Sequence, residues 1–239
     1  MKINIKADLH THTIASGHAY STVDELARSA SEKGLKLIAI TNHGPKMPGG
    51  PHQFHFGNMR IIPDELYGVR IIAGIEANIM NDGSIDLPEE RLKRLDFVAA
   101  GIHSDAGYNL NTKKDNTRVI IKAMENPYVQ MITHPANAAF PVNIEKIVES
   151  AFENNVILEA NASSFYDFKL GRRGNHEMSI NLCKLAKQRG VPVSLNSDAH
   201  FHTEVGDITF LNDVIQRAGL TKEDIINSSA EKIKNFLGL

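Results

Sequence analysis

The stretch "KADLHTHTIASGH", residues 6–18, places three histidines at the end of the first apolar run of the chain. If this run is a β-strand, its side chains alternate between two faces, so that Asp8, His10 and His12 share one face. Two histidines side by side at a strand end suit a single metal ion, and His18 is placed to turn back toward a second ion. A lone histidine is more often an ordinary core or surface residue, so the interpretation depends on the rest of the chain.

Length and composition set the bounds. With 239 residues, the chain is long for an ordinary domain but normal for one α/β barrel. The net charge of −2 gives no general attraction to nucleic acid or to anionic membranes. The first residues do not resemble a signal peptide, and no apolar run reaches the roughly 18 residues of a membrane span. Cys183 is the single cysteine, which excludes intrachain disulfides and thiolate metal clusters. We therefore expect a cytoplasmic protein with no membrane association.

Apolar runs rich in Val, Ile and Ala recur along the chain and alternate with helical patterns. The runs show little polar alternation, which is typical of parallel strands covered on both faces. Helices are predicted at 22–34, 142–155 and 176–190, and two closing helices at 210–219 and 222–239. The connection 44–68 is predicted to be a loop with a short helix. The seven predicted strands are 3–10, 36–43, 69–78, 97–103, 129–135, 156–163 and 191–198.

An unbroken series of seven βα units predicts one domain, residues 1–239, folded as a single distorted TIM-like (β/α)7 barrel of the α/β class. We find no linker, internal repeat or low-complexity segment that would divide the chain. In such barrels the active site lies at the carboxyl ends of the strands.

Histidines and carboxylates gather at these predicted strand ends. Scattered core or surface histidines have no reason to do so, and one polynuclear metal site accounts for all of them at once. The nine candidate metal ligands are His10, His12, His18, His43, Glu76, His103, His134, Asp198 and His200.

The donor types indicate the chemistry. Imidazoles and carboxylates without thiolates suit zinc, manganese, iron or cobalt in a hydrolytic role. Nine donors are too many for one ion, whereas three divalent ions sharing a bridging carboxylate would each have about three to four protein ligands. Three such ions facing only Glu76 and Asp198 would keep a positive field that favours a phosphate dianion. A bridging water would fall in pKa from near 16 to roughly 7, which gives a metal-bound hydroxide as nucleophile and requires no protein nucleophile.

The ordered motifs "DLHTHT", "TNHG", "GIEAN", "GIH", "ITHP" and "NSDAH" resemble those of the PHP (polymerase and histidinol phosphatase) superfamily, most closely the YcdX-type bacterial phosphatases. The resemblance covers nearly the whole chain and implies a distorted barrel with three metal ions, most often zinc, with manganese or iron as alternatives. It implies that Glu76 bridges two of them. The implied ligand sets are His10, His12, Glu76 and Asp198 for one ion, Glu76, His103 and His134 for a second, and His18, His43 and His200 for the third.

The second-strand motif departs from the family pattern. The family usually has Thr-Asp-His here, whereas this chain has "TNH" with Asn42. The ligand histidine is kept, so we expect the metal to be kept. Asn42 carries no negative charge, so its influence on neighbouring ligands is expected to differ.

Several further residues carry weaker predictions. Arg60 and Arg172, the latter next to Arg173, follow strand ends and are candidates for contacts with a substrate phosphate, with ordinary surface arginines as the alternative. Asp8 is a candidate for orienting a ligand histidine, with a buried carboxylate bonded to the backbone as the alternative. His52 and His55 are predicted to line or cover the pocket, with an ordinary surface loop as the alternative. Ser163 and Ser164 are candidates for donating to a phosphate, with loop capping as the alternative. Residues expected not to be ligands are His176 and His202, and Cys183 is expected in the core.

The interpretation is a metal-dependent phosphatase that acts on a small phosphorylated metabolite. Three alternatives stay open: a histidinol-phosphate phosphatase, a phosphoesterase that processes DNA ends, and a non-catalytic metal-binding protein. The free-standing, slightly acidic chain argues against nucleic acid as the substrate. Specificity is expected to lie in the loops 44–60 and 104–116, and the oligomeric state, including a homo-oligomer, stays open.

Overall fold

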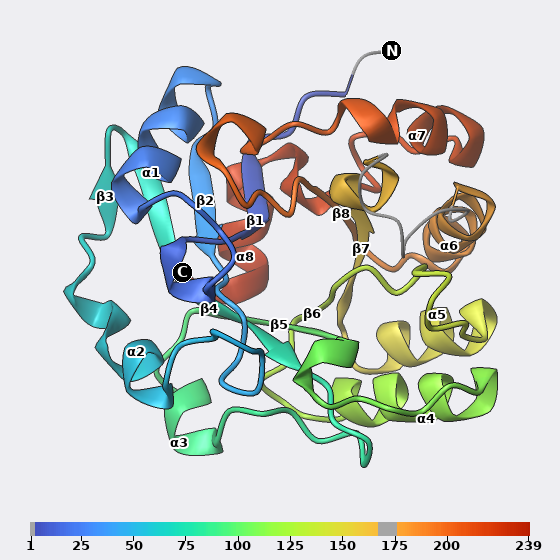
Figure 1. The fold of residues 1–239 in the computed structure, drawn as a ribbon. Coiled ribbons are helices and arrows are strands. Elements are labelled where there is room, and N and C mark those ends of the chain that lie inside the picture. The colour runs from blue at the N-terminus through green and yellow to red at the C-terminus, as the bar shows by residue number, and fades with distance from the viewer. Residues whose placement is uncertain (1–2, 167–175) are drawn as a thin grey trace.

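The computed structural model describes residues 3–166 and 176–239, and its centre is a nearly closed barrel of seven parallel strands (Figure 1). The strands follow one another around the barrel in the order β1-β2-β4-β5-β6-β7-β8. This confirms the predicted (β/α)7 architecture. The barrel strands are β1 (Ala7–Thr11), β2 (Leu37–Ile40), β4 (Val69–Asn78), β5 (Phe97–Gly101), β6 (Met131–Ile132), β7 (Ile157–Asn161) and β8 (Val193–Asn196).

Side chains close the seam between the first and last strands. The only backbone pairing across it in the described chain is at its carboxyl end, where the His12 N–H donates to the Ala199 carbonyl at 2.9 Å. Below that point the Asn227 amide fills the gap: its Nδ2 donates to the Ala7 and Leu195 carbonyls at 2.9 and 2.6 Å. The Leu195 N–H in turn donates to Asn227 Oδ1 at 3.1 Å. The Leu9 N–H likewise donates to Asn196 Oδ1 at 3.1 Å, so side chains supply the backbone partners that a further strand would provide.

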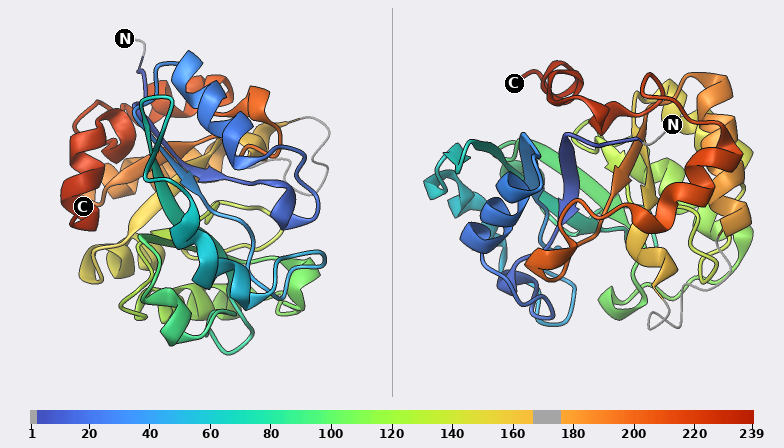
Figure 2. Two further views of the ribbon diagram at one scale, coloured as in Figure 1. Left: turned by 90° about the vertical axis from the view of Figure 1, so that its left-hand side faces the viewer. Right: turned by 90° about the horizontal axis from the view of Figure 1, so that it is seen from above.

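Helices cover the outside of the barrel, as the two further views show (Figure 2). Helix α1 begins with a capping box, in which the Thr22 hydroxyl accepts from the Glu25 N–H and the Glu25 carboxylate accepts from the Thr22 N–H. An apolar cluster fills the barrel interior and includes Leu9 of β1, Phe97 of β5 and Ile233 of the C-terminal helix. The helices are α1 (Val23–Glu32), α2 (Gln53–Asn58), α3 (Glu89–Leu92), α4 (Lys113–Met124), α5 (Ile144–Glu153), α6 (His176–Arg189), α7 (Asn212–Ala218) and α8 (Ala230–Leu237).

Strand β1 contains a bulge that changes which residues share a face. Its register with β2 pairs Asp8 with Ile38 but Thr11 with Ile40, so β1 has one residue more than its partner over this stretch. Asp8 consequently does not face the cluster of histidines. Its carboxylate accepts from backbone N–H groups, including those of Gly206 at 2.7 Å and His10 at 3.3 Å. The prediction that Asp8 shares a face with His10 is wrong, because side chains do not alternate regularly between the two faces of a strand across a bulge. The alternative, a buried carboxylate bonded to the backbone, is what the structure shows.

The long connections are more structured than predicted. The connection 44–68 holds α2, the 3-10 turn η2 (Met59–Ile61) and a two-residue strand, β3 (Glu65–Leu66), antiparallel to β4. The predicted loop 104–116 holds the 3-10 turn η3 (Ser104–Ala106), and α4 already begins at Lys113. None of the helices within the described residues has both the length and the apolar character that crossing a bilayer demands.

Candidate metal centre

The structure brings all nine predicted ligands to the carboxyl ends of the barrel strands. His10 lies in β1 and Glu76 in β4, and the others follow β1, β2, β5, β6 and β8 directly or after a short turn. His43 pairs through its backbone with Glu76 of the neighbouring strand. All except His18 and His200 are buried, at 7 % exposure or less. This placement follows from parallel topology, which directs every strand end to one rim.

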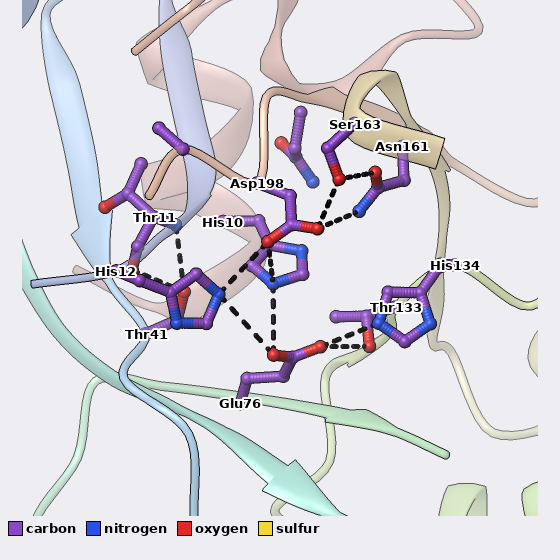
Figure 3. A network of polar contacts seen from close by, with 12 residues as sticks. His10, Thr11, His12, Thr41, Glu76, Thr133, His134, Asn161, Ser163 and Asp198 are labelled. Carbon is purple, nitrogen blue, oxygen red and sulfur yellow. Dashed lines mark hydrogen bonds and ion pairs between the residues drawn. The ribbon is translucent and has the colours of Figure 1, made fainter. Parts of the chain in front are cut away.

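Glu76 is the centre of the cluster (Figure 3). Its Oε2 lies 2.8 Å from His43 Nδ1, 3.2 Å from His10 Nε2 and 3.5 Å from His12 Nε2. Its Oε1 lies 2.9 Å from His134 Nε2 and 3.3 Å from His103 Nε2. The two oxygens therefore face two different groups of imidazoles, which is the arrangement that a bridging carboxylate needs.

A second carboxylate closes the cluster on the opposite side. Asp198 Oδ1 lies 3.2 Å from His12 Nε2 and 3.5 Å from His10 Nε2 (Figure 3). Beyond it, the ring of His18 stacks on those of His43 and His200, with centroids 4.9 and 5.0 Å apart. The three histidines that the family resemblance assigns to the third ion therefore lie together in the structure.

Four buried polar atoms in this cluster have no hydrogen-bond partner within the described part of the chain: His10 Nε2, His12 Nε2, His43 Nδ1 and Glu76 Oε2. The three nitrogens lie 2.8–3.5 Å from Glu76 Oε2 but do not form hydrogen bonds with it. The lone pairs of these four atoms therefore converge on the same region. Buried polar atoms are costly to leave unpaired, so this convergence indicates positively charged ions as their partners. Three triads have donor atoms within 4.8 Å of one another: His12, His43 and His200; His10, His12 and Glu76; and His43, Glu76 and His103. The donor set thus fits divalent metal ions.

Protein acceptors hold the second nitrogen of several of these imidazoles. His103 Nδ1 lies 2.8 Å from Asn78 Oδ1. The Nδ2 of the same Asn78 amide donates to the Asp86 carboxylate at 2.6 Å. His200 Nδ1 lies 2.9 Å from the Asp198 carbonyl. Since each acceptor requires a proton on the near nitrogen, the far nitrogen keeps its lone pair for a metal.

Asn42 acts on His12 through one hydroxyl. Its Oδ1 accepts from the Thr13 N–H at 2.8 Å and from the Ser16 hydroxyl at 2.9 Å. Because Ser16 donates its only proton there, its oxygen accepts from His12 Nδ1 at 3.1 Å. An amide oxygen suffices for this arrangement, which explains in structural terms how Asn serves at a position where the family usually has Asp. The Asn42 Nδ2, in contrast, faces His55 Nε2 at 3.3 Å, where an aspartate would present an oxygen.

The buried charges set the protonation of the cluster. Burial raises the pKa of Glu76, but the imidazoles of His10 and His103 outweigh it and hold the pKa well below its ordinary value. Burial and the neighbouring imidazoles of His43 and His200 lower the pKa of His12 well below the usual range. An ionised Glu76 beside a neutral His12 is the protonation pattern that a metal ligand set requires. Burial alone would lower the pKa of His10, but the carboxylates of Glu159, Glu76 and Asp198 outweigh it and raise that pKa well above its ordinary value, so a metal ion would have to displace a proton there.

A cavity of about 620 Å³ opens above the cluster. Its floor includes Glu76 and Asp198, and its mouth includes the aromatic side chains of Tyr20 and Phe201, which are 75 % and 43 % exposed. Two further carboxylates, Asp105 and Glu204, line it. Six of the nine candidate ligands therefore line a cavity that a small molecule could enter: His18, His43, Glu76, His103, Asp198 and His200.

The remaining predicted residues are placed as follows. Arg60 is exposed on η2 and is not among the described residues that line the cavity, while Arg172 and Arg173 lie outside the described residues. His52 is the N-cap residue of α2, where its side chain accepts from the Phe54 N–H, and it does not line the cavity. Ser163 donates to Asp198 Oδ2, and Ser164 binds Asn161 rather than lining the cavity. Three residues are expected to take no part. His176 lies at the surface, His202 is hydrogen-bonded to Ser21, and Cys183 is buried.

Sequence reasoning did not single out Glu159 and Asn161 in β7 or Asn78 in β4. Glu159 lies 2.7 Å from His10 Nδ1 and adds a third buried carboxylate to the two counted from the sequence. The available signal was the pattern "LEAN" in an otherwise apolar predicted strand, because a charged residue in a strand covered on both faces needs a partner.

The PHP domain profile matches residues 8–163, which is more than half of the chain. The chain belongs to the PHP domain family. A probable phosphatase of Caldanaerobacter subterraneus subsp. tengcongensis is 44 % identical over 99 % of this chain and 92 % of its own length. A probable phosphatase of Syntrophotalea carbinolica is 40 % identical over 99 % and 98 %.

Among solved structures, the histidinol phosphate phosphatase of Lactococcus lactis, crystallised with zinc, L-histidinol and phosphate, matches with a TM-score of 0.59 at 17 % identity. The match covers 90 % of this chain and 94 % of that one. At this level of identity the likeness establishes a shared fold, which agrees with the PHP assignment.

Proposed function

We propose that this PHP protein is a metal-dependent phosphatase that hydrolyses a small phosphomonoester at a centre of three divalent ions. The single observation that carries the proposal is the convergence of unpaired, buried histidine and carboxylate lone pairs at the floor of an open cavity. The relatives named as probable phosphatases support the activity. When bound, the ions would act as Lewis acids toward a phosphoryl oxygen and lower the pKa of a water molecule.

The three ions would be held by three ligand sets, and Glu76 would belong to two of them. His10, His12 and Asp198 would hold one ion with Glu76, and His103 and His134 a second one. His43 and His200 lie close to His12 and, with His18, would hold the third. The lone pairs stay aimed at the cavity because Asn78 and Ser16 bind the opposite nitrogens of His103 and His12. Zinc is the metal that the imidazole-rich set suits best, with manganese or iron as alternatives.

The cavity supports a small substrate rather than a polyanion. Among the described residues that line the cavity there are two further carboxylates, Asp105 and Glu204, and no lysine or arginine. A second phosphate near these carboxylates would be repelled, which disfavours nucleic acid and bisphosphates. We propose a phosphorylated metabolite with one phosphate group as the substrate.

The test combines metal content with phosphate release. Protein purified without chelator should contain about three ions per chain by elemental analysis. It should release phosphate from members of a panel of phosphomonoesters that includes histidinol phosphate. Chelator should abolish the activity, and zinc, manganese or iron should restore it. At most one ion under metal-replete conditions would refute the trinuclear site, and no activity on any monoester with metal present would favour a non-catalytic metal-binding protein.

A further inference from the structure

Strand β7 contributes none of the nine candidate ligands, although it lies inside the ring of strands that do. It pairs with β6 on one side and β8 on the other, the strands that His134 and Asp198 follow. Its Glu159 and Asn161 are two residues apart, so both side chains point to the same face. The two side chains are 1 % and 4 % exposed. A buried charge and a buried amide on this face require a physical explanation.

Glu159 connects two candidate ligands on two different strands. Its Oε1 lies 2.7 Å from His10 Nδ1 and accepts from Asn196 Nδ2 at 2.8 Å. Its Oε2 accepts from the His134 N–H at 2.7 Å and from Asn161 Nδ2 at 3.1 Å. Each oxygen is therefore committed to two donors within the protein, which leaves this carboxylate no capacity for a metal ion.

Asn161 continues the same network to the third strand. Its Nδ2 also donates to Asp198 Oδ2 at 3.2 Å (Figure 3), and its Oδ1 accepts from the Ser164 N–H. Ser163 in turn donates to Asp198 Oδ2 at 2.5 Å. The Asp198 Oδ1 is thereby left facing His10 and His12.

The backbone of both supported ligands is strained. His134 has φ of 34° and Asp198 has φ of 56°, in the left-handed region that non-glycine residues rarely adopt. Such conformations persist where surrounding contacts fix them, and they concentrate at functional sites. The Glu159 bond to the His134 N–H and the Asn161 bond to the Asp198 carboxylate are contacts of this kind.

We propose that Glu159 and Asn161 make β7 the positioning strand of the metal centre. Glu159 keeps the His10 proton on Nδ1, so that Nε2 is free for a metal, and fixes the backbone of His134. Asn161 turns one oxygen of Asp198 toward the same ion. Both are positioning residues rather than ligands, and the inference rests on the metal centre proposed above.

Glu159→Gln tests this role with almost no change in shape. Each oxygen of Glu159 accepts from two donors, so the NH₂ group of the variant faces donors in either orientation of the amide. We expect zinc affinity, measured by competition with a chromophoric chelator, to fall by about 10–100-fold. Glu149→Gln on α5 is the matched control, because Glu149 is exposed and pairs only with Arg189 in the described chain.

The metal dependence separates positioning from the alternatives. In Glu159→Gln, the metal concentration for half-maximal phosphatase activity should rise in step with the loss of affinity, while kcat at saturating metal returns to within a few fold of the parent. The number of bound ions at saturation should be unchanged. Loss of one ion would make Glu159 a ligand, and unchanged affinity would remove it from the centre; either result overturns the proposal.

Asn161→Ala gives a second, independent test, because it removes no charge. Its zinc affinity should fall in the same direction, and the change in the Co²⁺ absorption spectrum should show altered coordination. If Glu159→Gln fails to fold while Asn161→Ala folds and binds zinc as the parent does, the proposal is wrong. Failure of the parent to bind metal at all would instead refute the proposed function.

Discussion

Replacing Asn42 with Ala should weaken both the fold and the metal centre, although Asn42 touches no candidate ligand side chain. The amide is fully buried, and its Oδ1 accepts three hydrogen bonds. They come from the Thr13 N–H at 2.8 Å, the Thr13 hydroxyl at 3.0 Å and the Ser16 hydroxyl at 2.9 Å. In the variant all three donors lose their acceptor.

The magnitude follows from these three donors. An unsatisfied buried donor costs about 1–3 kcal/mol, and water entering the vacated space favours the lower end, which gives about 3 kcal/mol in total. With a urea m-value near 3 kcal/mol/M, the unfolding midpoint of the metal-free protein should fall by about 1 M. Ser16 is then free to rotate its proton toward His12, so His12 loses its fixed tautomer and zinc affinity should fall by about 10–100-fold.

Urea unfolding of metal-free protein and zinc competition titrations measure the two effects. Asn111→Ala is the control, because Asn111 is exposed. Asn42→Asp keeps the acceptor and should bind zinc at least as tightly as the parent. Equal zinc affinity in Asn42→Ala and the parent would refute the link from Asn42 through Ser16 to His12, whatever the change in stability.

Asn42→Asp also gives a pH effect of known sign at His55. In the parent, burial lowers the pKa of His55, so its contribution to stability is present above the unfolded pKa of about 6.5 and is lost as pH falls. In the variant a carboxylate faces Nε2 and should raise that pKa, so the contribution is present below about 6.5 and lost as pH rises. The stability of the variant relative to the parent should therefore be greater at pH 5.5 than at pH 8.

Three further predictions concern the seam, the outer ligand set and the cavity mouth. Asn227→Ala leaves the Ala7 and Leu195 carbonyls and the Leu195 N–H unpaired, and should lower the free energy of unfolding by about 3 kcal/mol or more, measured in urea. His200→Ala removes one neutral donor at the rim, and should keep its circular dichroism spectrum while losing at least about tenfold in phosphatase rate; an unchanged rate would exclude His200 from the reaction. Phe201→Ala should lower kcat/KM about three- to tenfold for aryl phosphates but not for glycerol phosphate, because only a flat leaving group gains from a ring at the cavity mouth; equal effects on both would contradict this role.

The strand ends were predictable because the topology determines where they go. A series of apolar runs separated by helical patterns predicts parallel strands, and parallel strands direct all their carboxyl ends to one rim. Histidines as distant in sequence as His10 and His200 could therefore be placed together without any knowledge of distances. In the structure the nine predicted residues do lie together in one cluster at the barrel rim, while their role as metal ligands stays a prediction.

The details that failed depend on register and on neighbours. The bulge in β1 adds one residue relative to β2, and nothing in the local sequence distinguishes that from regular alternation, so Asp8 was assigned to the wrong face. Glu159 and Asn78 act through partners on other strands, and their roles follow from which side chains meet across the barrel. Pattern reasoning assigns residues to a rim, whereas it cannot say which hydrogen bond each one makes.

The hydrogen bonds explain how the centre can be arranged before any ion binds. His10, His12, His103 and His200 each have one nitrogen committed to Glu159, Ser16, Asn78 or the Asp198 carbonyl. Their opposite nitrogens are thus held with lone pairs directed inward, at the expense of unpaired buried atoms and of two strained backbones. An ion that satisfies these atoms binds the folded state and not the unfolded chain, so it must stabilise the fold by an amount that grows with its concentration. The same arrangement that makes the metal-free centre unfavourable therefore makes metal binding and folding a coupled equilibrium.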